Sequence, residues 1–280
     1  MKENVKENID KIHVKTKTLK ELIFDPTVRL LPGQIAFFLI LSIFPLLMLV
    51  GYVASFFDIS IVSLLSALED ALPTEVFNVI SDVISGKSFD NTIGISILIG
   101  FILASNGAHA IVLASNALYG FPSDDFVKRR VKSMIMIIIL VFLFVFVMLV
   151  LAYGNIIAKI IMEWFGVTNA SQTIYKIFVI AKWPIAIIMI FLSIKLIYVI
   201  APDWHILSKN TTKGAMFTTI GWTVATAVFS YYITHFANYD IFYGSLSSIV
   251  IFMIWIYFLS YILVVGIAIN VKQYKDKEDQ

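Results

Sequence analysis

The sequence predicts an all-α integral membrane protein: a six-helix transmembrane bundle with an amphipathic N-terminal helix and an outer amphipathic helical segment between spans one and two. Three observations lead to this fold class. Of the 280 residues, 59% are hydrophobic and only 14% are charged, and the mean hydropathy is +0.89. Soluble domains are about half apolar and about a quarter charged. The composition therefore excludes a soluble enzyme, a disordered chain and a fibrous protein.

Residues 1–30 are predicted to form a cytoplasmic, basic amphipathic segment. Its apolar residues fall near one helical face, and lysines fill much of the rest. Such a helix binds the anionic inner leaflet of a membrane. We therefore expect membrane lipids as partners through the N-terminal lysines, and we expect no nucleic acid, in keeping with a net charge of only +2.

The transmembrane domain is predicted over residues 31–270. A transmembrane helix needs about 20 mostly apolar residues, and six stretches satisfy this requirement: 33–57, 92–118, 133–158, 174–200, 212–235 and 242–270. The connection over 58–91 carries apolar residues at helical spacing on either side of Pro73, together with several acidic residues. It is expected to form amphipathic helices on the outer surface, either packed on the bundle as a cap or closing over a cavity as a lid.

The distribution of Lys and Arg predicts that both termini are cytoplasmic. Sixteen of the 21 basic residues lie before the first span, in the second and fourth connections, or in the tail 271–280. The opposite connections hold only Lys87 and Lys159. Cytoplasmic segments carry the excess of Lys and Arg, and an even number of spans agrees with two termini on one side.

Polar residues within two spans are the candidates for a cavity or pathway. In the second span, Ser105, His109, Asn116 and Tyr119 fall on one stripe about 80° wide, with Asn106 at its edge. Because polar groups cannot face lipid cheaply, this stripe must face other helices or water. Two interpretations remain open: hydrogen bonds that fix helix packing, or a pathway in which His109 binds a proton or an anion.

The fifth span carries a second stripe of small and hydroxyl residues, and it includes Thr219, Thr223 and Thr226. Small residues at this spacing permit close helix approach. The alternative is a hydroxyl-lined wall that faces the stripe of the second span.

The sequence predicts no catalytic residues, no metal site and no cofactor. It contains no cysteine, no P-loop, no HExxH and no GxSxG segment, and every Asp and Glu lies at or beyond a span end. We therefore expect that the protein is not an enzyme.

Several motifs, taken in order, resemble the YihY/BrkB family of bacterial inner-membrane proteins over about residues 30–270. They include the Ser42-x-Phe-Pro45 end of the first span, Asn116-x-x-Tyr119, Tyr198 followed by Pro202, and the Tyr-Gly-Ser-Leu that holds Gly244. Trp255, Gly266 and Asn270 complete the series. Relatives often have Glu where this chain has Ala268, and many have Tyr where it has Phe38. A family carboxylate is thus absent here.

The resemblance implies a structural role for Ser42, Pro45, Pro202, Gly244, Trp255, Gly266 and Asn270, and a multi-pass place in the bacterial plasma membrane. Some members carry an old ribonuclease BN label, and others are called virulence or serum-resistance factors. Metal-dependent RNA cleavage needs clustered His and Asp ligands, which this sequence does not suggest. We expect a transporter or flippase-like protein for a lipid or small amphiphile at the cell envelope. The alternative is a non-transporting envelope scaffold or assembly protein, and a homo-oligomer is left open.

Overall fold

A computed structural model describes residues 29–42, 69, 74, 77–78, 81, 93–122, 126–143, 146, 172–236 and 246–278. These residues are helical except for short turns and connections, and they contain no strand. The all-α fold class is therefore confirmed for the described part of the chain. The six-span count stays a prediction.

The longer observed helices each overlap one predicted span. Their bounds are Arg29–Ser42, α6 (Ile93–Tyr119), residues 126–143, α8 (Gln172–Ile200), α9 (Ser208–Phe236) and α11 (Ser247–Glu278). α6, α8 and α9 agree closely with their spans, whereas α11 continues beyond residue 270 to Glu278. The helix over 126–143 includes the basic residues that precede the predicted third span. α8 continues through Pro184.

Three of these helices are long and apolar enough to cross a membrane, by length and composition: Phe101–Tyr119, Trp183–Ile200 and Ser247–Asp276. The helix Arg29–Ser42 is apolar but shorter. α9 has 29 residues, and its threonines and serines make it less apolar than α8.

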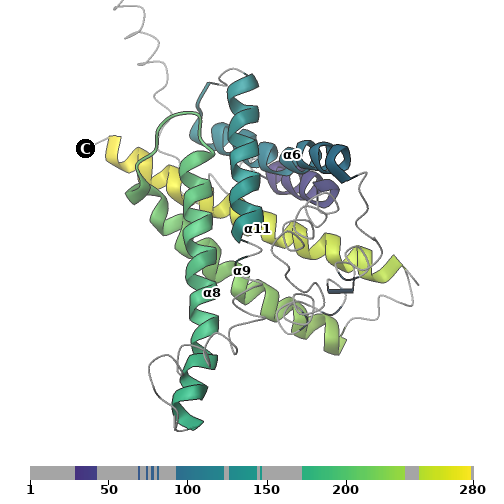
Figure 1. Cartoon of the computed structure of the whole chain (residues 1–280). Helices are drawn as coiled ribbons and strands as arrows, with labels where there is room; N and C mark the ends of the chain where they lie inside the picture. Colours follow the sequence, from purple (N-terminus) through teal and green to yellow (C-terminus); the bar gives the residue numbers. More distant parts are fainter. Residues whose placement is uncertain are drawn as a thin grey trace, which may run out of the picture.

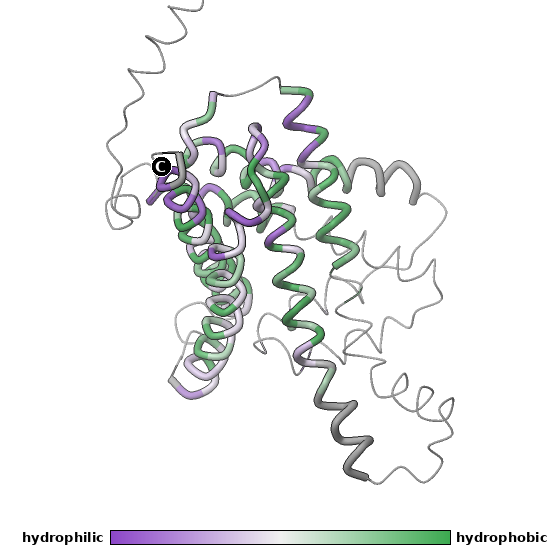
Figure 2. The backbone as a smooth tube through the Cα atoms, turned by 90° about the vertical axis from the view of Figure 1, so that its left-hand side faces the viewer, coloured by the Kyte–Doolittle hydropathy of each residue, from purple (hydrophilic) through white to green (hydrophobic). Residues whose placement is uncertain are grey.

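The helices cross one another rather than running in one common direction. In Figure 1, α8 and helix 126–143 run vertically, α9 and α11 slant across the view, and α6 lies crosswise. α9 packs against both α8 and α11, and α11 also touches α6. Figure 2 shows hydrophobic helix middles and many hydrophilic residues toward the end of the molecule that holds the C-terminus.

One buried core joins all of the longer helices. Each contributes at least one almost fully buried side chain to it: Ile35, Ile111, Met136, Ile194, Ala215 and Ile267. Burying large aliphatic side chains is the main source of packing energy in such a core. Phe77, from the predicted outer segment 58–91, packs against the same cluster.

α8, α9 and α11 approach closely because two glycines lie at their crossing. A Cβ at Gly214 would clash with the carbonyl oxygen of Gly266 and with the Asn270 side chain, and a Cβ at Gly266 would clash with Tyr198 and Thr218. The Tyr198 hydroxyl donates to the Leu263 carbonyl at 2.8 Å and accepts from Thr218 Oγ1 at 2.7 Å. The amide of Gly214 donates to Asn270 Oδ1 at 2.8 Å.

The ends of α6 and α8 are determined locally. Gly120 has a positive φ of 75°, and the amides of Gly120 and Phe121 both donate to the Asn116 carbonyl, at 2.9 and 3.1 Å. This is the left-handed glycine that ends many helices. α8 ends at Ile200, before Pro202, which lacks the N–H that a helix needs.

Several predicted features fall wholly or mostly outside the described residues. They are the N-terminal segment 1–28, Pro45 and the rest of the first span, most of the outer segment 58–91, the end of the third span, and Gly244. Within 58–91 the five described residues are helical. The amphipathic nature of both segments stays a prediction.

Candidate functional site

The polar stripe of α6 lies against the first turns of helix 126–143. Arg130 Nη1 donates to Asn106 Oδ1 at 2.8 Å, and Arg130 Nη2 donates to the Ile102 carbonyl at 2.8 Å. One helical turn farther along α6, His109 contacts Ser133 at 3.2 Å and the ring of Phe126 at 6.2 Å between centroids. His109 thus contacts two separate turns of helix 126–143, as expected where two helices cross.

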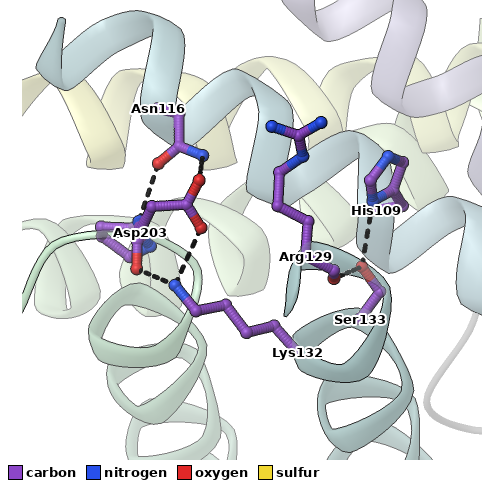
Figure 3. Close-up of polar contacts among 7 residues, drawn as sticks. His109, Asn116, Arg129, Lys132, Ser133 and Asp203 are labelled. Carbon is purple, nitrogen blue, oxygen red and sulfur yellow. Dashed lines mark hydrogen bonds and ion pairs between the residues drawn. The ribbon is translucent and has the colours of Figure 1, made fainter. Parts of the chain in front are cut away.

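Figure 3 shows the contact between His109 and Ser133, and the second bond of the serine indicates which of the two donates. The Ser133 hydroxyl donates its single hydrogen to the Arg129 carbonyl at 2.8 Å. Its oxygen is then the acceptor for His109 Nδ1, which must carry a hydrogen. The Arg129 side chain points toward α6 between His109 and Asn116 (Figure 3).

Asn116 joins the end of α6 to the connection between α8 and α9. Its Nδ2 donates to Asp203 Oδ2 at 2.7 Å, and its Oδ1 accepts from the Asp203 amide at 2.8 Å. Both residues are buried. Both the Nδ2 donor and the Oδ1 acceptor of Asn116 bond to Asp203. These two bonds fix the position of the α8–α9 connection relative to the end of α6.

Lys132 completes this network from helix 126–143. Its Nζ lies 2.9 Å from Asp203 Oδ1, where the lysine side chain is 18% exposed and the aspartate side chain is 0% exposed. The same Nζ donates to the Pro202 carbonyl at 2.6 Å. A carboxylate this deeply buried needs a cationic partner, so Lys132 neutralises Asp203 at the meeting point of three segments.

Two members of the predicted stripe have other surroundings. Ser105 is fully buried, and its hydroxyl donates within α6 to the Ile102 carbonyl at 2.7 Å. Tyr119 stacks on Phe121 at 5.1 Å, which in turn stacks on the exposed Trp204 at 5.2 Å. The buried Tyr119 hydroxyl has no hydrogen-bond partner in the described part of the chain.

The threonines of α9 make a different set of contacts. The hydroxyls of Thr219 and Thr223 donate to carbonyls one turn back in α9, at 2.8 and 2.9 Å. Thr226 Oγ1 accepts from Trp255 Nε1 of α11 at 3.3 Å. The α6 stripe is therefore bonded to helix 126–143 and the α8–α9 connection, whereas these three threonines bond within α9 or to α11.

The site combines cationic, amide and imidazole groups, which suit the binding of an anion. The described residues contain no group of three or more His, Asp or Glu side chains that could hold a metal ion. Lys132 is paired with Asp203, whereas Arg130 bonds to two neutral acceptors on α6.

Nearly the whole chain matches one protein-family model. The family model described as "Virulence factor BrkB" matches residues 25–280. The chain belongs to the BrkB family. This confirms the resemblance inferred from the order of the sequence motifs.

The relatives of this BrkB protein include one that aligns over most of its length. The "Putative ribonuclease-like protein YfkH" of Bacillus subtilis (strain 168) is 28% identical over 251 residues, which are 88% of this chain and 90% of that protein. A UPF0761 membrane protein of Glaesserella parasuis serovar 5 (strain SH0165) is 29% identical over 82 residues, 29% of each chain. Another, of Tolumonas auensis (strain DSM 9187 / NBRC 110442 / TA 4), is 34% identical over 74 residues, 26% of this chain and 24% of that protein. No solved structure matches.

The family-motif residues that the structure describes lie at helix contacts. The Ser42 hydroxyl donates to the Phe38 carbonyl one turn back at 2.6 Å. Its oxygen lies 3.2 Å from the Leu103 carbonyl of α6 and accepts from the Gly107 amide of α6 at 3.2 Å. Pro202 offers its carbonyl to Lys132, and Trp255 donates to Thr226. Gly266 and Asn270 form the crossing with α9 described above.

Sequence reasoning missed the partners of the α6 stripe. Arg130 and Lys132 were used there only as markers of the cytoplasmic side, Ser133 only as the start of a span, and Asp203 only as an acid beyond a span end. The sequence offers one signal: a short connection that begins at Gly120 separates the end of the second span from the basic run 128–132. That signal does not reveal which residues meet.

Proposed function

We propose that this BrkB-family membrane protein is a plasma-membrane transporter or flippase-like protein that handles a lipid or small amphiphile. The observation that supports it most is the polar and cationic contact between α6 and helix 126–143. Asn106 and His109 lie inside the apolar stretch Phe101–Tyr119, yet they bond to Arg130 and Ser133. Polar groups inside a membrane span are costly and commonly mark a substrate path.

The surface beside this contact is apolar, as an amphiphile with a polar head requires. Ile102 and Leu103 of α6 and Val127 and Val131 of helix 126–143 are all exposed. Polar groups could therefore hold a head group while the exposed side chains meet its hydrocarbon. An entirely polar solute would gain nothing from this second surface.

The membrane arrangement is part of the proposal. We assign six spans, with α9 as the fifth, because Met216, Ile220, Val224 and Val228 form an exposed apolar side on it. The connections after α6 and α8 and the end of α11 lie together, since Phe121 contacts both Trp204 and Tyr274. Lys and Arg are in excess at the helix ends that border these connections, at 128–132, at 209 and 213, and at 272–277. We therefore assign these ends, and both termini, to the cytoplasm.

The proposal is tested with the full chain in vesicles that carry a fluorescent phosphatidylglycerol. The protein is expected to speed the exchange of the labelled lipid between leaflets, which is read from its accessibility to an impermeant quencher. His109→Ala should abolish this activity without changing folding. His235→Ala removes an exposed histidine at the end of α9 and is the matched control. Exchange no faster than in empty vesicles would rule out the flippase-like proposal, and untargeted lipid profiling of a deletion strain against its complemented parent would extend the search to other substrates.

A scaffold is the second candidate, supported by the close packing of α8, α9 and α11. Tyr198, Gly214 and Gly266 leave no room for a Cβ at either glycine, which is the arrangement of a rigid framework. A scaffold would bind partners without moving lipid. It is favoured if the vesicle assay fails and a deletion strain shows no change in lipid or metabolite levels. The word "ribonuclease-like" belongs to the name of a relative, and the function proposed here is not enzymatic.

A further inference from the structure

Arg130 of helix 126–143 is held in place by two hydrogen bonds to α6. Its Nη1 donates to Asn106 Oδ1 and its Nη2 to the Ile102 carbonyl, each at 2.8 Å. The two acceptors lie four residues apart on α6, so the planar guanidinium is fixed along one turn of that helix. A guanidinium has five N–H donors, and these two bonds leave donors for a further ligand.

The charge of Arg130 is not balanced by either acceptor. A side-chain amide and a backbone carbonyl are both neutral, and in the described residues no carboxylate pairs with Arg130. Lys132, two residues later, has Asp203 as its ionic partner. An arginine beside an apolar span is expensive unless an anion accompanies it.

Exposed apolar side chains lie near Arg130 on both helices, next to the exposed Lys128. On helix 126–143, Val127 precedes Arg130 by about one turn and Val131 follows it directly, and the two valines are 62% and 50% exposed. On α6, Ile102 and Leu103 are 40% and 47% exposed. A free inorganic anion would meet this surface unfavourably, whereas the acyl chains of a lipid would cover it.

We propose that Arg130 binds the phosphate of an anionic phospholipid, with Ile102, Leu103, Val127 and Val131 against its acyl chains. Arginine suits this role because its planar fork can offer two parallel hydrogen bonds to phosphate oxygens. This site identifies the amphiphile of the proposed function as an anionic phospholipid. The inference rests on the proposed function only for the claim that the bound lipid is moved across the membrane. Binding is measured without transport, so the two proposals fail separately.

The test compares lipid binding by the full-length protein and its variants, by native mass spectrometry in detergent. The probes are phosphatidylglycerol, phosphatidylcholine, and glycerophosphoglycerol, which is the head group without acyl chains. Wild type is expected to prefer phosphatidylglycerol. Arg130→Gln should weaken that binding about tenfold, as expected for the loss of a charge-assisted hydrogen bond, and Arg130→Lys should restore part of it. Lys213→Gln, at an exposed position of α9, is the control and should bind like wild type.

The outcomes separate the sources of the phosphate. Equal affinity of Arg130→Gln and wild type for phosphatidylglycerol overturns the site. Glycerophosphoglycerol that binds as well as the lipid overturns a lipid ligand in favour of a soluble phosphate. If Arg130→Gln does not fold, phosphatidylglycerol with a photoreactive acyl chain is crosslinked to wild type. Crosslinks at residues 102–103 or 127–131 support the site, and crosslinks only elsewhere overturn it.

Discussion

Nδ2 of Asn116 lies 2.7 Å from Oδ2 of Asp203, although the two residues are 87 positions apart in the chain. The return bond, from the Asp203 amide to Asn116 Oδ1, is 2.8 Å long. Lys132 reaches the same carboxylate from a third segment. These contacts hold the end of α6, the start of helix 126–143 and the α8–α9 connection in one arrangement, in which Arg130 of helix 126–143 bonds to the same helix, α6, that carries His109.

Asp203→Asn should lower the stability of the protein by about 1–3 kcal/mol. The substitution leaves Lys132 largely buried without a counter-charge, and uncompensated charges are strongly destabilising, although the 18% exposure of this lysine lessens the penalty. Thermal unfolding in detergent, followed by tryptophan fluorescence, should show a lower midpoint. Asp276→Asn, an exposed acid near the end of α11, is the control and should leave the midpoint unchanged.

The ion pair can be isolated by a double variant. Asp203→Asn combined with Lys132→Met should be less destabilised than the sum of the two single variants, because no unpaired charge remains. Strict additivity would show that the two side chains do not interact in the folded protein.

Gly214→Ala should destabilise the protein by about 1–3 kcal/mol, the usual cost of overpacking a core. The new Cβ would meet the carbonyl oxygen of Gly266, which is backbone and cannot rotate away. Gly33→Ala is the matched control: a Cβ there meets nothing within 4 Å, and alanine favours a helix by up to about 1 kcal/mol. The two unfolding midpoints should move in opposite directions, and equal tolerance of both alanines would argue against the close crossing of α9 and α11.

The meeting of α9 and α11 at one end of the molecule can be tested by crosslinking, because the chain contains no cysteine of its own. Gln273 Nε2 lies 3.5 Å from the Lys209 carbonyl, so cysteines at positions 209 and 273 should be joined by a short thiol-reactive linker. A pair at 234 and 273 should not react, since 25 residues of helix place position 234 roughly 37 Å from position 209. Reaction of both pairs, or of neither, would contradict the arrangement.

The proposed topology predicts where single cysteines react with an impermeant maleimide. Lys275→Cys should be labelled only after the membrane is permeabilised, because the end of α11 is assigned to the cytoplasm. Lys87→Cys, in the predicted outer connection, should be labelled in intact cells. The reverse pattern would invert the orientation inferred from the Lys and Arg distribution.

Helix positions were predictable because the relevant signals are local. The fourth span was predicted over 174–200 and α8 runs from Gln172 to Ile200; the second was predicted over 92–118 and α6 runs from Ile93 to Tyr119. Apolar composition, the left-handed Gly120 and the helix-breaking Pro202 act within a few residues. The family could also be identified from the sequence, because its motifs, from Ser42 to Asn270, occur in the expected order.

The partners of the α6 stripe were not predictable in this way. Helical periodicity places His109 and Asn116 on one side of a helix, and burial cost requires polar partners for that side. It does not say that Ser133 and Asp203 provide them, because those contacts join segments 24 and 87 residues apart. Such pairings depend on how the helices cross, and the crossing depends on side chains from several helices at once, such as Gly214 against Gly266.

The amino-acid sequence is thus enough to establish a helical membrane protein of the BrkB family, with its main helices and its polar residues inside them. The fold adds the pairing of those residues. In the sequence, Arg130 and Lys132 serve only to predict the cytoplasmic side. In the fold, Lys132 forms an ion pair with Asp203, and Arg130 bonds to α6 near exposed apolar side chains. The physical reason is that hydrophobicity and helix ends are properties of short stretches, whereas the compensation of a buried charge depends on whichever group the folded chain brings within about 3 Å.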